Sequence, residues 1–99
     1  MTFEQIVEAA LAELPPELAR GLRNVAIVIE DEREGDPGLY GLWEAEDYMP
    51  DKITIFQRPL ERSFADENEL REEIRITVLH ELAHYFGIDE DRLDELGYS

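Results

Sequence analysis

The chain has 99 residues, so we expect residues 1–99 to form a single small domain. Its net charge of −16, from 25 acidic and 9 basic residues, disfavours binding to nucleic acid or to an anionic membrane surface. The chain has no cysteine, which excludes disulfides, thiol catalysis and cysteine-based metal sites.

The sequence also indicates where the protein works. Met1 to Gln5 contain no basic region followed by an apolar run, as a secretory signal does. No stretch approaches the roughly 18 apolar residues of a membrane span. We therefore expect a cytoplasmic protein.

The first predicted element is a helix from Thr2 to Glu13. Thr2 can cap its N-terminus while Gln5 returns the hydrogen bond, and apolar residues recur at helical spacing. Pro15 and Pro16 end this helix, and a short helical turn from Glu17 to Leu22 follows.

Three strands are predicted next, separated by acidic loops. Val25 to Ile29 is apolar without interruption, which favours a strand covered on both faces. Leu39 to Trp43 is the second strand and Lys52 to Phe56 the third, and Pro59 ends the third. At the edge of the sheet, the third strand would pair with an extended peptide, whereas an interior strand would not.

A long helix from Asp66 to Phe86 follows. Asp66 caps it with Glu69 as the capping-box partner, and Gly87 suits the left-handed residue that closes a helix. A last short helix near Glu90 to Leu96, capped by Asp89, completes the order helix, three strands, long helix, short helix. This order predicts an α+β fold in which helices cover a small three-stranded sheet, and a mixed sheet is one of the arrangements left open.

The long helix carries a His-Glu-x-x-His motif that contains both histidines of the chain. Positions i and i+4 share one face of a helix, so His80 and His84 can hold one metal ion between them, with Glu81 beside them. Glu73 and Thr77 extend this polar stripe. The opposite side is apolar and should pack on the core through Ile74, Val78, Leu82 and Phe86. The alternative is a pair of surface histidines on an exposed helix.

A catalytic zinc site needs three protein ligands and one open position for water. The sequence continues as His-Glu-x-x-His-x-x-Gly-x-x-Glu, which ends at Glu90, where the metzincins have histidine. Because Gly87 lets the chain reverse, we favour Glu90 as the third ligand. The alternatives are Asp89, Asp91 and Glu95.

These residues predict a hydrolytic mechanism. One zinc ion lowers the pKa of its bound water towards about 7 and polarises a peptide carbonyl. Glu81 acts as the general base and later passes the proton to the leaving amine. Tyr98 is the best candidate for a hydrogen-bond donor to the tetrahedral intermediate, and its alternative role is a tail residue packed on the surface.

The stretch from Arg75 to Ile88, followed by Leu93 and by Glu95 to Tyr98, resembles the small bacterial zincin-like metallopeptidase family. The resemblance implies a minimal zincin-like fold, zinc at His80 and His84, and a general base at Glu81.

The sequence differs in one position from the pattern of this family, and in one feature from the larger metzincins. The family usually has aspartate where this chain has Glu90. The methionine turn of larger metzincins is absent, since Met1 and Met49 both lie upstream of the motif, and Tyr98 would form the floor of the site instead.

The main functional hypothesis is therefore a zinc metallopeptidase that hydrolyses peptides or unfolded proteins. The alternative is a zincin-like binding or regulatory module with weak or no catalysis, because the short chain lacks one wall of a normal peptidase cleft. A homodimer would supply that wall, although no residue requires one. A third reading, an acidic mimic of nucleic acid, leaves His80 and His84 unexplained.

Overall fold

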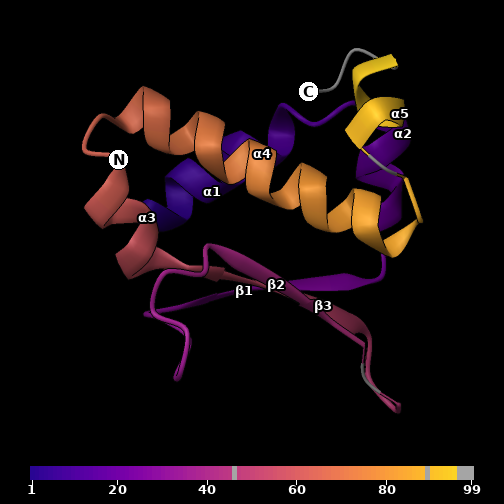
Figure 1. Ribbon diagram of the computed structural model, residues 1–99, viewed down its shortest axis with the longest axis horizontal. Coiled ribbons are helices and arrows are strands. Elements are labelled where there is room, and N and C mark those ends of the chain that lie inside the picture. Colours follow the sequence, from indigo (N-terminus) through magenta and orange to yellow (C-terminus); the bar gives the residue numbers. More distant parts are fainter. Residues whose placement is uncertain (46, 89, 96–99) are drawn as a thin grey trace.

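The computed structural model of the chain describes residues 1–45, 47–88 and 90–95, apart from the side chains of Glu90 and Leu93. Helices lie together on one side of a three-stranded sheet (Figure 1). The elements follow in the order α1 (Phe3–Ala12), α2 (Pro16–Ala19), a 3-10 turn (Arg20–Leu22), β1 (Val25–Glu30), β2 (Gly41–Glu44), β3 (Asp51–Phe56), α3 (Gln57–Ser63), α4 (Glu67–Tyr85) and α5 (Glu90–Glu95). The predicted α+β class is confirmed.

The sheet is mixed and has the strand order β1-β3-β2. β1 runs parallel to β3 and β2 runs antiparallel to it, with Trp43 opposite Ile53. The third strand is therefore central, so the possibility that it offers a free edge to a peptide is wrong. β2 is an edge strand instead.

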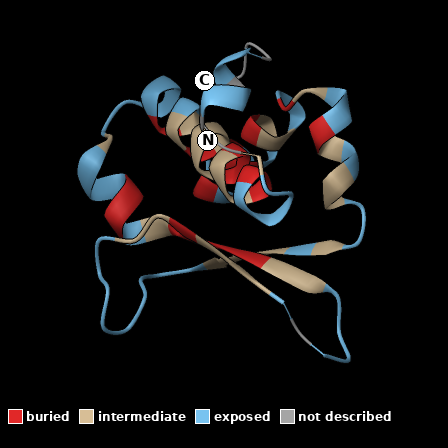
Figure 2. Ribbon diagram, turned by 45° about the vertical axis from the view of Figure 1, so that its right-hand side comes forward, coloured by how far each residue is buried: buried red, intermediate tan, exposed pale blue. Residues whose placement is uncertain are grey.

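The helices cover only one face of the sheet (Figure 2). No residue of β1 is fully buried, and Ala26 is exposed. The prediction that β1 is covered on both faces is therefore wrong. An edge strand beneath a single helical layer buries one side only, even when its sequence is continuously apolar.

One hydrophobic core fills the space between the sheet and the helices. Its buried members come from α1, α2, β3, α3 and α4, and they include Phe3, Ile6, Val7, Ala10, Leu18, Ile53, Ile55, Leu60, Ile74, Val78 and Leu82. The Thr2 cap of α1 is present as predicted, with Gln5 N donating to Thr2 Oγ1 at 3.1 Å and Thr2 N to Gln5 Oε1 at 2.9 Å.

α4 begins after Asp66 and ends before Gly87, as its sequence predicts, but no bond from the Glu69 side chain back to Asp66 N is found among the described residues. The Asp66 carboxylate accepts a hydrogen bond from Glu69 N at 3.0 Å, which caps the N-terminus. At the other end Ile88 N donates to Ala83 O and Gly87, with φ of 70°, donates to His84 O. This pair of bonds is a Schellman motif, which stops α4 one residue after His84.

β3 ends at Phe56 as predicted, and Pro59 lies in the first turn of α3, a helix that the sequence analysis did not predict. One prediction about α4 is wrong. Phe86 does not join the core and is 50% exposed. Its ring lies beside Gly21, where an added Cβ would come within 2.7 Å of Phe86 Cε2.

Two arginines of α4 form ion pairs with glutamates. Arg71 forms an ion pair with Glu13 at 3.2 Å. Arg75 forms one with Glu72 at 2.6 Å, and this hydrogen bond lowers the pKa of the Glu72 carboxyl and raises the pKa of Arg75. Among the described helices, none is both long enough and apolar enough to cross a lipid bilayer.

Candidate active site

His80, Glu81 and His84 line one cavity of about 360 Å3. The cavity lies between α4 and the segment from Gly38 to Gly41, which leads into β2, and Glu73 and Thr77 of the predicted polar stripe also line it. The side chains of His80 and Glu81 are half-buried, and His84 is exposed. The structure thus brings both imidazoles and the Glu81 carboxylate to the same opening.

The Glu81 carboxylate is held by the backbone of β2. Trp43 N donates a hydrogen bond to Glu81 Oε2 at 3.0 Å, in a partly buried position. Tyr40, directly before β2, accepts a hydrogen bond from Phe56 N of β3. In an antiparallel pair, the backbone groups of successive residues alternately face the partner strand and point away from it. The Trp43 N–H, three residues after Tyr40, therefore points away from β3. The edge of the sheet therefore orients Glu81, and no described residue donates to Glu81 Oε1.

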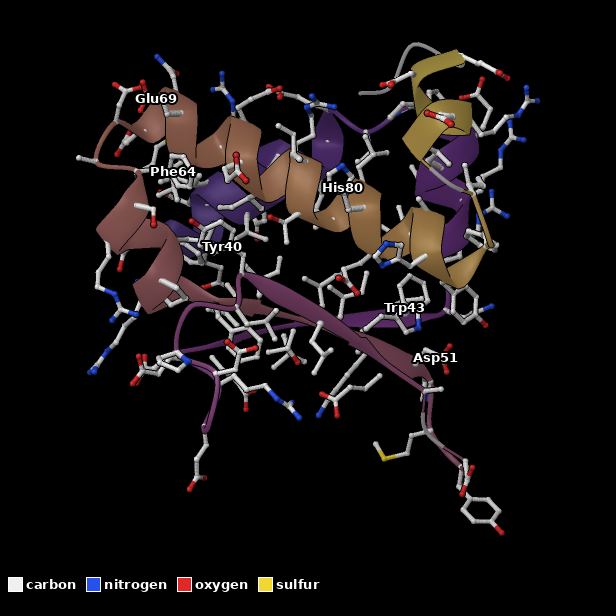
Figure 3. All side chains as sticks on the ribbon, viewed as in Figure 1. Tyr40, Trp43, Asp51, Phe64, Glu69 and His80 are labelled. Atoms are coloured by element: carbon white, nitrogen blue, oxygen red, sulfur yellow. The ribbon has the colours of Figure 1, made fainter. Side chains whose placement is uncertain are left out.

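The Trp43 side chain lies near Asp51 (Figure 3) and is held on two sides. Its ring stacks on Tyr85 of α4 with centroids 4.2 Å apart and an angle of 12° between the planes. Its Nε1 donates to Asp51 Oδ2 at 3.1 Å. These contacts, together with the bond to Glu81, join β2 to the end of α4 that carries the motif.

The approach of β2 to α4 depends on Gly41, which is buried and begins the strand. A Cβ at this position would lie 2.7 Å from Thr77 Cγ2. Glycine weakens strands in general, but here it allows the backbone to pass close to the helix, one turn before Glu81.

Replacing Gly41 by alanine is expected to push β2 away from α4, because overpacking of this kind typically costs about 1–3 kcal/mol of stability. The melting temperature should fall, and the tryptophan emission should change as Trp43 moves. Thr77→Ser removes the clashing methyl group, so the double variant Gly41→Ala/Thr77→Ser should recover most of both losses. A double variant no better than Gly41→Ala would contradict this explanation.

The donors in this cavity suit zinc. Two imidazoles one helical turn apart line a common opening, and zinc accepts nitrogen and carboxylate oxygen ligands. Within the described part of the chain, no third histidine, aspartate or glutamate joins His80 and His84 in a metal-binding group. Asp91 and Glu95, two of the alternative third ligands, are among the described residues and are therefore not grouped with the histidines. The Glu95 carboxylate forms an ion pair with Arg92 at 3.0 Å.

The remaining predicted site residues lie outside the described part. The backbone of Glu90 begins α5, but its side chain is not described, and Asp89 and Tyr98 are not described at all. The sequence did not point to Trp43, whose backbone N–H holds Glu81 from 38 residues away. The sequence feature that could have drawn attention to it is that Trp43, the single tryptophan, lies two residues after Gly41 in a short predicted strand.

Comparison with known proteins supplies the family. A search of curated proteins finds no significant match. The family model described as zincin-like metallopeptidase matches residues 22–98, which include β1 to α4 and the whole His-Glu-x-x-His segment. Because the match spans most of the sequence and the fold and motif agree with it, this chain belongs to the zincin-like metallopeptidase family.

Proposed function

We propose that this chain is a zinc-dependent peptidase that hydrolyses peptide bonds in peptides or unfolded proteins. Membership of the zincin-like metallopeptidase family supports zinc-dependent hydrolysis as the general activity. The observation that carries the specific proposal is the Glu81 carboxylate, held by the edge strand at 3.0 Å in the cavity that both histidines line.

His80 and His84 would hold the zinc ion, with Glu90 as the proposed third ligand. The arrangement of Gly87 supports this choice, because the chain reverses immediately after α4 and α5 begins at Glu90. The bound ion would supply a Lewis acid that acidifies water and polarises the substrate carbonyl.

Glu81 is proposed as the general base. Its Oε2 is occupied by the Trp43 N–H, so Oε1 is the oxygen that would accept the proton of the attacking water. The same oxygen would then return that proton to the leaving amine. A carboxylate fixed by a backbone donor keeps its orientation during both transfers, which a freely rotating side chain would not.

Tyr98 is the proposed donor to the oxyanion that develops on the substrate carbonyl. The outward-facing edge of β2 beside the cavity provides the surface along which an extended peptide would lie. The acidic surface, with a net charge of −16, favours peptide partners over nucleic acid.

Removing the metal tests the proposal. Purified protein should contain close to one zinc per chain by elemental analysis, and it should cleave a mixture of quenched fluorescent peptides. A chelator should abolish cleavage, and added zinc should restore it. Absence of zinc binding with excess metal at neutral pH would contradict the proposal, whereas zinc binding without cleavage of any peptide would favour the binding-module alternative.

A further inference from the structure

A second cavity, of about 380 Å3, lies at the end of the sheet where β1 and β3 begin. Its walls include two arginines from the segment before β1, two stacked aromatic rings and one carboxylate. We call it the arginine pocket and define it by Arg20, Arg23, Trp43, Asp51 and Tyr85. None of its residues belongs to the predicted metal centre.

The arginine pocket adjoins the candidate active site. Trp43 lines the pocket, and its backbone N–H holds Glu81 in the neighbouring cavity. Tyr85, which stacks on Trp43, directly follows His84 in α4. Trp43 and Tyr85 therefore connect the arginine pocket to the segments that carry Glu81 and His84.

The arginine pocket is cationic on a strongly acidic protein. Arg20 and Arg23 are exposed, and neither forms an ion pair with a residue that the structure describes. Asp51 is the only acidic residue found among its described lining residues, and its Oδ2 already accepts the Trp43 Nε1 hydrogen. By contrast, glutamates neutralise Arg62, Arg71 and Arg75.

We propose that the arginine pocket binds a carboxylate of the peptide substrate and so determines specificity, an inference that rests on the proposed peptidase function. Guanidinium groups present forked donors that match a carboxylate. The Trp43 and Tyr85 rings form an apolar wall for the stem of the same residue. The carboxylate comes either from an acidic side chain or from the C-terminus of the peptide, and the experiment separates the two.

Trp43 is the only tryptophan in the chain, so its fluorescence reports on the arginine pocket without any metal. Metal-free protein should show a saturable change with a short peptide that has a central glutamate and capped ends. Its affinity should be about tenfold higher than that of the glutamine counterpart, the effect of one charge-assisted hydrogen bond. An uncharged peptide with a free C-terminus tests the other source of carboxylate.

Variants assign the discrimination to the two arginines. The double variant Arg20→Gln/Arg23→Gln should bind the charged and uncharged peptides equally. Arg58→Gln, which removes an exposed arginine from α3, is the matched control and should keep the tenfold preference. Equal binding of all peptides by the unmodified protein, or a preference that survives in the double variant, would overturn the proposal.

Cleavage assays then connect the arginine pocket to the reaction. The kcat/KM of zinc-loaded protein should favour the carboxylate-bearing peptide by about tenfold, and this ratio should approach one in the double variant. If the fluorescence titration shows carboxylate binding but no peptide is cleaved, the peptidase function is contradicted and carboxylate binding by the arginine pocket is retained. If peptides are cleaved without a preference for a carboxylate and without a fluorescence change, carboxylate binding by the arginine pocket is contradicted and the peptidase function is retained.

Discussion

Replacing Glu81 by glutamine is expected to lower the kcat of peptide hydrolysis by about 10²- to 10⁴-fold, the usual contribution of a general base. Glutamine keeps the shape of the side chain, and its carbonyl oxygen can still accept the Trp43 N–H bond at 3.0 Å. What it loses is the ability to take a proton. Zinc content and melting temperature should therefore match those of the unmodified protein, as measured by elemental analysis and calorimetry.

Glu73→Gln is the matched control for this experiment. Glu73 is on the same helix, lines the same cavity and undergoes the same change of charge, but it makes no hydrogen bond to β2. Its hydrolysis rate should change much less than that of Glu81→Gln. If the two variants lost activity equally, the effect would come from the charge of the cavity and not from a specific base.

Replacing either His80 or His84 by alanine is expected to weaken zinc binding by at least about 100-fold, since loss of an outer-shell partner alone costs 10- to 100-fold. Competition with a chromophoric chelator measures this change. Neither imidazole is buried in the core, so the metal-free variants should keep the circular dichroism spectrum of the unmodified protein. Variants that bind zinc normally would show that the ion is held elsewhere.

The pH dependence of zinc affinity distinguishes the ligands further. Imidazole binds metal only when neutral, so protons compete with the metal and the zinc affinity should fall as the pH is lowered. Two imidazole ligands predict a loss of up to about 100-fold per pH unit in the acidic range, because two protons compete with the metal. His80→Ala should halve the slope of this logarithmic plot. A flat profile in the unmodified protein would contradict ligation by histidine.

The long helix was predictable because every signal for it is local. Asp66 caps it, Gly87 closes it, and an apolar repeat through Ile74, Val78 and Leu82 marks the buried side. The position of the motif on one polar stripe follows from the same repeat, which is why the sequence placed His80 and His84 together. Local signals also gave the Thr2 cap of α1.

Features that depend on distant parts of the chain were not predictable. The order β1-β3-β2 is set by which strands pair, and nothing within Lys52 to Phe56 distinguishes a central strand from an edge strand. The bond from Trp43 to Glu81 joins residues 38 positions apart. The helix α3 was missed because a proline after a strand is equally typical of a loop and of the first turn of a helix.

The helix α1 lies outside the part of the chain that matches the family, which begins at residue 22. It nevertheless supplies Phe3, Ile6, Val7 and Ala10 to the core, against the buried side of α4. The matched region therefore does not contain the whole hydrophobic core. Residues 22–98 alone would leave apolar side chains of α4 exposed to water, on the side of the helix opposite to His80 and His84.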